Sequence, residues 1–296
     1  MNATPVIMNP LGVSPEAERR LEGRTRGEGA DDPEPDYGDL AAVARWRRGQ
    51  HEAWGEGIEP GEVEHEPTEI AGRPALVAGP PEAPVVLYLH AGGFCLGSPG
   101  TDAPITARLA RVLRVVSLDY RLAPEHPFPA AIDDAEAAFR QLMSDHGRVG
   151  LAGTSAGGNL AVGVARRCRE LEPAALALFC PHLDIGARRD RSLRGFEIAY
   201  LDGHDARDSW VSPAAATLEE LGPLPPLLVQ WTDAEPMAGD IAAFVETFAT
   251  GTDAVTAGVW QRLWHAWHYH RELPEAWAAV DGAANWLFGA LTAELG

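Results

Sequence analysis

Short apolar runs alternate with longer amphipathic segments from Arg73 onward. Runs of this length that are apolar almost throughout are typical of strands buried on both faces of a parallel sheet, and the longer segments are typical of helices. The alternation therefore predicts a mainly parallel sheet covered by helices. We expect strands over Val85–His90, Val115–Tyr120, Val149–Gly153, Ala174–Cys180 (where Ala174–Leu178 would suit a helix equally well), Leu227–Trp231 and Val255–Trp260. We expect helices over Ile105–Leu113, Ala130–Ser144, Asn159–Leu171, Ile241–Thr250 and Pro274–Leu295.

The first 70 residues lack this alternation. The stretch Gly27–Pro35 is rich in glycine, proline and acidic residues, which form neither helices nor strands well, so it is predicted to be a linker. Tyr37–Trp54 has a helical pattern of apolar positions. We therefore divide the chain into an N-terminal segment, residues 1–70, and one α/β domain, residues 71–296.

Composition excludes several classes of protein. The 296 residues carry a net charge of −19, which argues against nucleic acid as a partner. No run of about 18 apolar residues is present, so no membrane-spanning helix is expected. The three cysteines lack C-x-x-C spacing, which predicts neither a disulfide framework nor a structural zinc site and favours a reducing, cytoplasmic location. All 24 basic residues are arginine, a bias that says nothing about fold.

The run Gly153–Gly157 has the pattern G-x-S-x-G, with Ser155 at its centre. It lies between a predicted strand and a predicted helix. A serine in such a turn is the nucleophile of many hydrolases, because small neighbours allow a strained backbone that presents the hydroxyl at the edge of the sheet. A glycine turn that only permits close packing is the alternative, and the strand–serine–helix context favours the nucleophile.

A second glycine-containing motif, His90–Phe94, directly follows the strand that begins at Val85. Acyl transfer requires backbone N–H groups that stabilise the oxyanion of a tetrahedral intermediate, and glycines leave such groups uncrowded. We expect Gly92, Gly93 and Ala156 to supply these donors. His90 is expected to hold the shape of the loop.

Three further runs accompany His90–Phe94: D-Y-R-L-A-P-E at Asp119–Glu125, F-P-A-A-I-D-D at Phe128–Asp134, and G-T-S-A-G-G-N at Gly153–Asn159, which contains the serine. Together these motifs resemble those of the hormone-sensitive-lipase-like group of α/β-hydrolases, the bacterial family IV esterases. The resemblance extends from about Leu76 to the C-terminus. It implies an α/β-hydrolase fold with an N-terminal helical cap, which part of residues 181–216 would complete. It also implies ester substrates, no cofactor or metal, and dimers as a common state. One departure is Ala91, where the family usually has a glycine.

A serine nucleophile needs a base and an acid, which follow it in the order acid and then histidine in α/β-hydrolases. Two carboxylates, Asp233 and Glu235, come after the predicted strand Leu227–Trp231. The resemblance favours Glu235, because Glu235-Pro236-Met237 aligns with the family's Asp-Pro-Leu. Asp233 remains the alternative acid, and Asp240 is a more remote one.

Three histidines follow the strand Val255–Trp260. The family pattern of apolar and aromatic neighbours selects His265 as the base, and His268 and His270 are expected to cap the loop or face solvent. Three close histidines also suggest a metal site. We do not favour one, because no carboxylate or cysteine pattern accompanies them in the sequence.

The sequence therefore predicts a serine carboxylesterase that hydrolyses short- to medium-chain acyl esters of small molecules. One alternative is a lactone, amide or acetyl-group hydrolase with the same catalytic residues. Another, from a different class, is a non-catalytic ligand-binding protein on the same scaffold. The presence of Ser155, an acid and His265 favours an enzyme.

Overall fold

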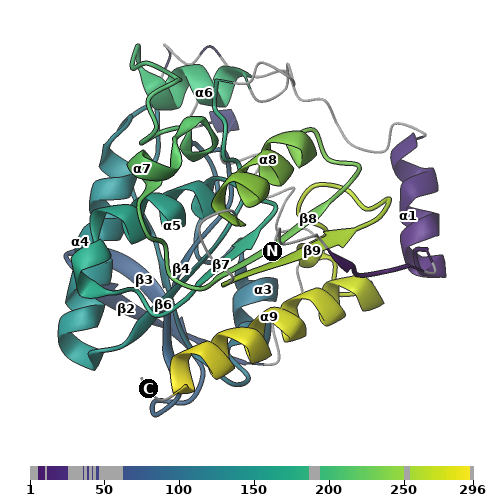
Figure 1. The fold of residues 1–296 in the computed structure, drawn as a ribbon, viewed down its shortest axis with the longest axis horizontal. Coiled ribbons are helices and arrows are strands. Elements are labelled where there is room, and N and C mark those ends of the chain that lie inside the picture. Colours follow the sequence, from purple (N-terminus) through teal and green to yellow (C-terminus); the bar gives the residue numbers. More distant parts are fainter. Residues whose placement is uncertain are drawn as a thin grey trace.

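The computed structural model describes residues 6–10, 12–25, 36, 39, 42, 45–46, 63–186, 194–249 and 254–293. Its strands form one nine-stranded sheet with the order β1-β9-β8-β7-β6-β4-β5-β3-β2 (Figure 1). Neighbouring strands are parallel, except that β3 is antiparallel to both β2 and β5. The strands are β1 (Val6–Ile7), β2 (His65–Ile70), β3 (Arg73–Ala78), β4 (Val85–Leu89), β5 (Arg114–Leu118), β6 (Val149–Thr154), β7 (Leu176–Phe179), β8 (Leu227–Thr232) and β9 (Val255–Trp260).

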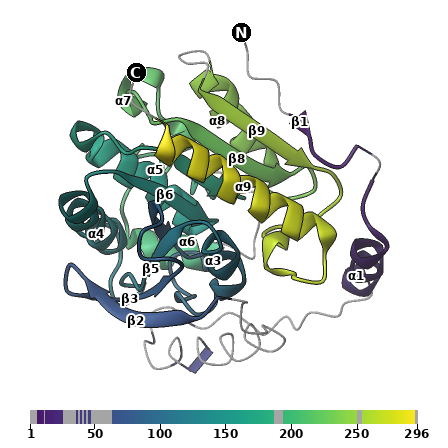
Figure 2. The same cartoon turned by 90° about the horizontal axis from the view of Figure 1, so that it is seen from below.

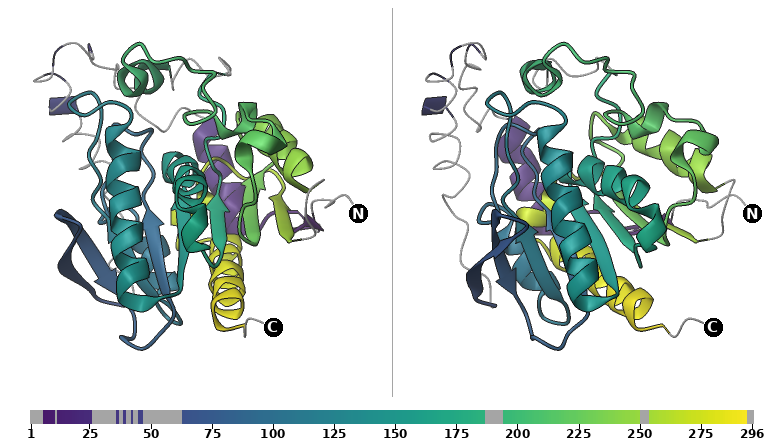
Figure 3. Two further views of the ribbon diagram at one scale, coloured as in Figure 1. Left: turned by 60° about the vertical axis from the view of Figure 1, so that its left-hand side comes forward. Right: turned by 90° about the vertical axis from the view of Figure 1, so that its left-hand side faces the viewer.

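Helices cover both faces of the sheet. They are α1 (Pro15–Thr25), α3 (Ala103–Leu109), α4 (Ala130–His146), α5 (Ala156–Arg167), α6 (Arg194–Leu201), α7 (Leu218–Leu221), α8 (Ala238–Ala249) and α9 (Pro274–Thr292), with 3₁₀ turns η1 (Arg169–Leu171), η2 (Pro213–Ala215) and η3 (Trp267–Tyr269). Helices α3 and α9 pack together on one face, and α4, α5 and α8 cover the other (Figures 1 and 2). Helix α6 lies beyond the ends of the strands, as both views in Figure 3 show.

Strand β4 shows why the pattern of apolar residues predicts this architecture. All of its five residues are buried. Val85, Leu87 and Leu89 belong to the core cluster shared with α4, α5 and α8, whereas Val86 and Tyr88 belong to the cluster shared with α3 and α9. Side chains of a strand alternate between the faces of the sheet, so a strand covered on both faces must be apolar throughout.

All six predicted strands and all five predicted helices are present, with ends that differ by a few residues. The stretch Ala174–Cys180 forms β7 rather than a helix. The sequence analysis did not predict β1, β2, β3, α1, α6 or α7. The predicted linker Gly27–Pro35 lies outside the described residues, as does most of the predicted helix Tyr37–Trp54.

Part of the N-terminal segment belongs to the sheet and its covering. Strand β1 pairs with β9 at one edge, and β2 pairs with β3 at the other, so the boundary at residue 71 falls within the β2–β3 hairpin. Helix α1 packs Ala17 into a cluster that contains Trp264 and Trp267. The Asn9 side chain donates to the Gln261 carbonyl and accepts from its N–H. Residues 6–25 therefore brace the segment that follows β9.

Candidate active site

Ser155 lies in the sharp turn between β6 and α5. Its backbone has a φ of +54° and a ψ of −115°, a conformation that non-glycine residues rarely adopt and that is frequent at functional sites. The glycines around it are sterically required. A Cβ on Gly157 would lie 1.9 Å from the Leu89 carbonyl oxygen, and one on Gly153 would lie 2.3 Å from the Gly157 carbonyl oxygen. The G-x-S-x-G pattern thus allows the turn to sit against the end of β4.

Three side chains predicted to act together are hydrogen-bonded in series. The His265 ring joins the other two: its Nε2 atom is 2.9 Å from Ser155 Oγ, and its Nδ1 atom is 2.6 Å from Glu235 Oε2. The Glu235 side chain is fully buried, and its second oxygen accepts a hydrogen bond of 3.0 Å from the Thr232 N–H. The carboxylate is therefore held on both oxygens and oriented toward the imidazole.

Asp233 and Asp240 do not contact this histidine ring. The Asp233 side chain is exposed and accepts a hydrogen bond of 2.7 Å from the Arg262 N–H, which shapes the loop after β9. Asp240 is buried in the first turn of α8. Of the three carboxylates that follow β8, the structure thus brings only Glu235 to His265.

The loop after β4 contains the predicted oxyanion donors. Gly92 and Gly93 have φ values of +128° and +58°, which glycine adopts without strain. A Cβ on Gly92 would lie 2.1 Å from the Leu96 carbonyl oxygen, and one on Gly93 would lie 3.0 Å from the Phe196 ring on α6. Gly92, Gly93 and Ala156 donate no backbone hydrogen bond to any residue that the structure describes.

His90 has the structural role expected of it, and residues that follow β5 add further contacts. The His90 ring stacks on Tyr120 with 4.1 Å between ring centroids, and the Tyr120 hydroxyl donates to the His90 carbonyl. Arg121 forms an ion pair of 2.7 Å with Asp134, the last residue of the F-P-A-A-I-D-D motif. These contacts hold the oxyanion loop from the side of α4.

The other histidines of the site differ from expectation in one respect. His270 is partly exposed and packs against Trp264, but His268 is buried between Trp267 and Phe179 rather than capping the loop or facing solvent. His268 lies within the 3₁₀ turn η3, which directs its ring into the core. Burial lowers the pKa of His268 well below its usual value, so the ring is neutral at pH 7.

Sequence reasoning missed a buried carboxyl group beneath the oxyanion loop. Asp102, just before α3, is fully buried. Its Oδ2 atom accepts hydrogen bonds from the Tyr88 hydroxyl at 2.8 Å and the Ala91 N–H at 3.3 Å, and Oδ1 accepts one from the Tyr269 hydroxyl at 2.9 Å. Burial raises the pKa of Asp102 to about 7, against the opposing effect of the hydrogen bonds from the two tyrosines. An acidic residue in a turn gives no signal of this role in the sequence.

The partners of Asp102 come from three parts of the site. Ala91 is in the oxyanion loop, and Tyr269 belongs to the segment that carries the catalytic-site histidine. The Tyr88 hydroxyl also lies 2.7 Å from Thr154 Oγ1, directly before the serine. Asp102 therefore connects to the oxyanion loop and the histidine segment through direct hydrogen bonds, and to the serine turn through the Tyr88 hydroxyl.

We expect Asp102→Asn to lower kcat for ester hydrolysis by about 10- to 100-fold above about pH 8, where the Asp102 carboxyl is ionised, because hydrogen bonds to a charged group contribute about 1.5–3 kcal/mol and small displacements of reacting groups are costly. KM should change by less than about threefold, since Asp102 lies beneath the loop and not in contact with substrate. Steady-state kinetics on a p-nitrophenyl ester measure both. Glu136→Gln is the matched control, because it removes a partly buried carboxylate on α4 that is ion-paired with Arg140 and Arg167 and makes no contact with Asp102. An unchanged kcat in Asp102→Asn would contradict the prediction.

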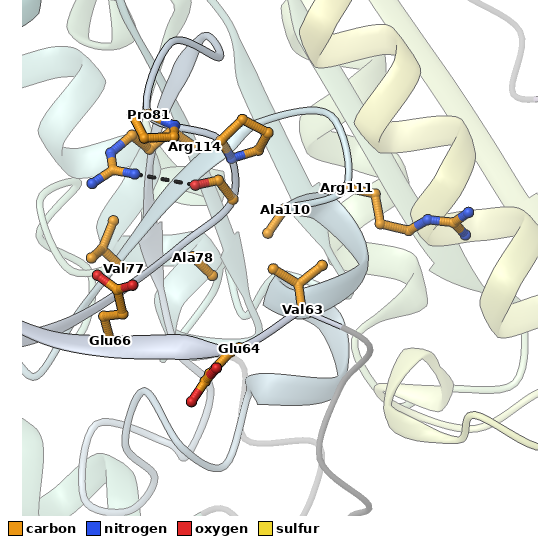
Figure 4. Close-up of a pocket in the computed structure, with 11 residues that line it drawn as sticks. Val63, Glu64, Glu66, Val77, Ala78, Pro81, Ala110, Arg111 and Arg114 are labelled. Atoms are coloured by element: carbon orange, nitrogen blue, oxygen red, sulfur yellow. Dashed lines mark hydrogen bonds between the residues drawn. The ribbon is translucent and has the colours of Figure 1, made fainter.

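Two cavities differ in their relation to the site. One of about 610 Å³ is lined by residues such as Val63, Ala110 and Arg114 (Figure 4). It lies near the N-terminal ends of β4 and β5, whereas Ser155, Glu235 and His265 all follow the C-terminal ends of their strands. The other, of about 720 Å³, lies between α6 and the segment after β7 and is lined by Ile185, Gly186, Glu197, Ile198, Leu201, His204, Asp205, Ala206 and Arg207.

The second cavity is close to the serine. Glu197, which lines it, lies 3.6 Å from the His182 ring, and the His182 N–H donates to the Ser155 carbonyl. Burial lowers the pKa of His182 to about 4, and the charge of His265 acts in the same direction. His182 is therefore a neutral residue between the cavity and the serine turn at pH 7.

A mainly parallel sheet whose strand–serine–helix turn meets a glutamate–histidine pair is the architecture of the α/β-hydrolases. A family model described as alpha/beta hydrolase fold matches residues 86–269. This chain belongs to that family and, within it, to the hormone-sensitive-lipase-like group.

Two curated relatives illustrate the similarity. An acetyl-hydrolase of Streptomyces hygroscopicus is 36% identical over 225 residues, which are 68% of this chain and 74% of the relative. Esterase LipI of Mycobacterium tuberculosis (strain ATCC 25618 / H37Rv) is 34% identical over 232 residues, 68% of this chain and 71% of the relative.

Solved structures agree over more of the chain. A hormone-sensitive lipase from a metagenome library superposes with a TM-score of 0.84 and 26% identity, covering 95% of this chain and 100% of the other. EstE5, in a crystal soaked with p-nitrophenyl butyrate, superposes with a TM-score of 0.81 and 27% identity, again over 95% and 100%. Among the described residues, no helix is long and apolar enough to cross a membrane.

Proposed function

We propose that this protein is a serine carboxylesterase that forms an acyl-enzyme on Ser155. The observation that carries the proposal is the series of hydrogen bonds in which His265 joins the Ser155 hydroxyl to the buried Glu235 carboxylate. A serine hydroxyl is a weak nucleophile by itself, and an imidazole that can take its proton makes it reactive.

In the first step, Ser155 Oγ attacks the ester carbonyl carbon while His265 Nε2 takes the hydroxyl proton. Glu235 keeps the other ring proton on Nδ1 and stabilises the imidazolium that forms. Collapse of the tetrahedral intermediate expels the alcohol, which receives the proton from His265. Water then attacks the acyl-enzyme by the same route and releases the carboxylic acid.

The N–H groups of Gly92, Gly93 and Ala156 bind the oxyanion in both steps. Ala156 directly follows the nucleophile in the strained turn at Ser155. The positive φ values of Gly92 and Gly93 shape the loop that supplies the other two donors. Each such donor contributes about 3–4 kcal/mol to stabilisation of the transition state in related chemistry.

We propose that the acyl chain of the substrate binds in the cavity of about 720 Å³ beside α6. This volume is within the range of small-molecule sites, about 300–1,000 Å³. Its apolar lining from Ile185, Ile198 and Leu201 suits a short- to medium-length acyl chain.

We further propose that α6 and the N-terminal segment form a cap over the site, in keeping with the division into residues 1–70 and 71–296 and with a contribution from residues 181–216. Phe196 on α6 lies against Gly93, and the Trp46 ring lies 5.4 Å from the Phe196 ring. A residue from the N-terminal segment thus reaches the helix that covers the oxyanion loop. We also propose a cytoplasmic location, since all three cysteines are free and buried. We propose a homodimer as the oligomeric state.

Hydrolysis of p-nitrophenyl esters with acyl chains from two to sixteen carbons tests the proposal. We expect kcat/KM to peak at a short to medium chain and to fall steeply for long chains. A peak at the acetyl ester would favour an acetyl-group hydrolase. Labelling of Ser155 by a fluorophosphonate without turnover of any ester would favour a lactone or amide substrate. Neither labelling nor turnover in the folded protein would favour the binding protein and contradict the proposal.

A further inference from the structure

Cys180 lies beside the proposed catalytic residues but has no part in the hydrolytic steps. It directly follows β7, and its side chain is fully buried in the cluster formed with α1 and the segment after β9. Its Sγ atom, a Glu235 carboxylate oxygen and a His265 ring nitrogen all lie within 4.8 Å of one another. Among the described residues, no other group brings three metal-ligating atoms of this kind together.

Cysteine, glutamate and histidine are all zinc ligands. Zinc–ligand bonds of about 2.0–2.3 Å place the ligand atoms of a tetrahedral site roughly 3.5 Å apart. The three atoms here therefore need to move by only about an ångström to reach that geometry. The His265 side chain is 32% exposed, whereas the Glu235 side chain is fully buried, so of the two ligands only the histidine reaches the surface.

We propose that Cys180, Glu235 and His265 form an inhibitory site for a thiophilic divalent cation, with Zn²⁺ as the natural probe. This inference rests on the proposed function, because it makes the metal a competitor for the catalytic base. The sequence does not favour a metal site, because no carboxylate or cysteine pattern accompanies the three histidines there. The fold supplies both ligands from segments that are distant along the chain.

The charges of the three ligands suit the cation. The Cys180 side chain is fully buried, and a buried cysteine is a thiol in the free protein. On binding, the metal displaces the thiol proton, which leaves to solvent. The resulting thiolate and the carboxylate together neutralise the two positive charges of the cation, which removes the main cost of placing an ion in a buried site.

Metal binding would inactivate the enzyme through the histidine. In the triad, the His265 proton is on Nδ1, where Glu235 accepts it, and Nε2 is free to take the serine proton. A metal on Nδ1 leaves the single ring proton on Nε2, facing Ser155 Oγ. The ring then cannot accept a proton, and the metal occupies the Glu235 oxygen that would stabilise the imidazolium. Chelation should restore activity because no bond is oxidised or cleaved.

Zinc inhibition and cobalt spectroscopy of the full-length protein test the proposal together. In wild type we expect ZnCl₂ to inhibit ester hydrolysis and EDTA to restore it. Addition of CoCl₂ should give a thiolate-to-cobalt charge-transfer band in the near ultraviolet. In Cys180→Ser and Cys180→Ala we expect the band to disappear and the half-inhibiting Zn²⁺ concentration to rise at least tenfold, because a neutral hydroxyl or methyl group is a poor zinc ligand. If the serine variant is unstable, the alanine variant provides the test, because a methyl group suits the apolar surroundings of this position.

Cys168→Ser is the matched control, because it alters another buried cysteine that lies at the end of α5. It should keep both the band and the wild-type sensitivity to Zn²⁺. Inhibition of Cys180→Ala at the wild-type Zn²⁺ concentration would overturn the proposal, as would a charge-transfer band that survives in that variant. The cobalt band is independent of turnover, so an inactive protein that still shows it would count against the proposed esterase function and not against the metal site.

Discussion

Replacement of Ser155 by alanine is expected to lower kcat/KM for the best p-nitrophenyl ester by at least about 10⁴-fold. Removal of a serine nucleophile leaves only the contribution of the oxyanion donors and of substrate binding, and in serine hydrolases this residue accounts for a loss of about 10⁴- to 10⁶-fold. The His265 base then has no hydroxyl to activate. The rate is measured under steady-state conditions on purified protein, with a fluorophosphonate probe to confirm that labelling is lost.

The fold should survive this change. Ser155 already has a φ of +54°, and alanine carries the same backbone strain, so the melting temperature should stay within a few degrees of wild type. Ser117→Ala is the matched control, because it makes the same side-chain change at a fully buried serine on β5 whose hydroxyl has no hydrogen-bond partner among the described residues. It should keep its activity. Substantial turnover by a folded Ser155→Ala protein would refute the assignment of the nucleophile.

The second large effect is expected at the catalytic acid, for which Glu235 and Asp233 are the two candidates. We expect Glu235→Gln to lower kcat by about 10³- to 10⁴-fold, in line with the effect of an acid-to-amide change in a serine protease triad. The Thr232 N–H holds the oxygen of the new amide, as it now holds Oε1, so the NH₂ group faces His265 Nδ1. That nitrogen must then accept a hydrogen bond, which moves the ring proton to Nε2 and prevents proton transfer from Ser155.

Asp233→Asn is the comparison variant. We expect kcat to change by less than about threefold, because the exposed Asp233 side chain accepts a backbone N–H and an amide oxygen can do the same. Both variants are assayed on the same ester across pH, with melting temperatures measured in parallel. A larger loss of turnover in Asp233→Asn than in Glu235→Gln would exclude Glu235 as the catalytic acid.

Much of the fold could be predicted from local patterns. The central strands are apolar along their whole length because helices cover both faces, and this double burial leaves a signal in any short window of sequence. Strands β2 and β3 left no such signal. The residues of β2 are mostly exposed and polar, and β3 has Pro74 as its second residue, so neither stands out in the sequence and each depends on pairing with its neighbouring strand.

The serine turn and the oxyanion loop were likewise determined by sequence, because steric exclusion acts over a few residues. Gly153, Gly157 and Gly92 each lie where a Cβ would collide with nearby backbone, so the glycines themselves mark the turn. The histidine could be placed by its position after the last long strand. The family pattern also selected His265 from the three histidines, but only the tertiary structure showed that His268, three residues later, is buried in the core, since the direction of its ring depends on the turn at η3.

The sequence by itself thus determined the layered architecture, the nucleophile turn and the order in which nucleophile, acid and base occur. The tertiary structure decided which carboxylate meets His265, that Asp102 connects the parts of the site, and that Cys180 lies beside Glu235. Local patterns report steric and burial constraints that act within a few residues. Contacts between polar side chains from separate loops depend on how the loops are placed in space, and no short stretch of sequence records that placement.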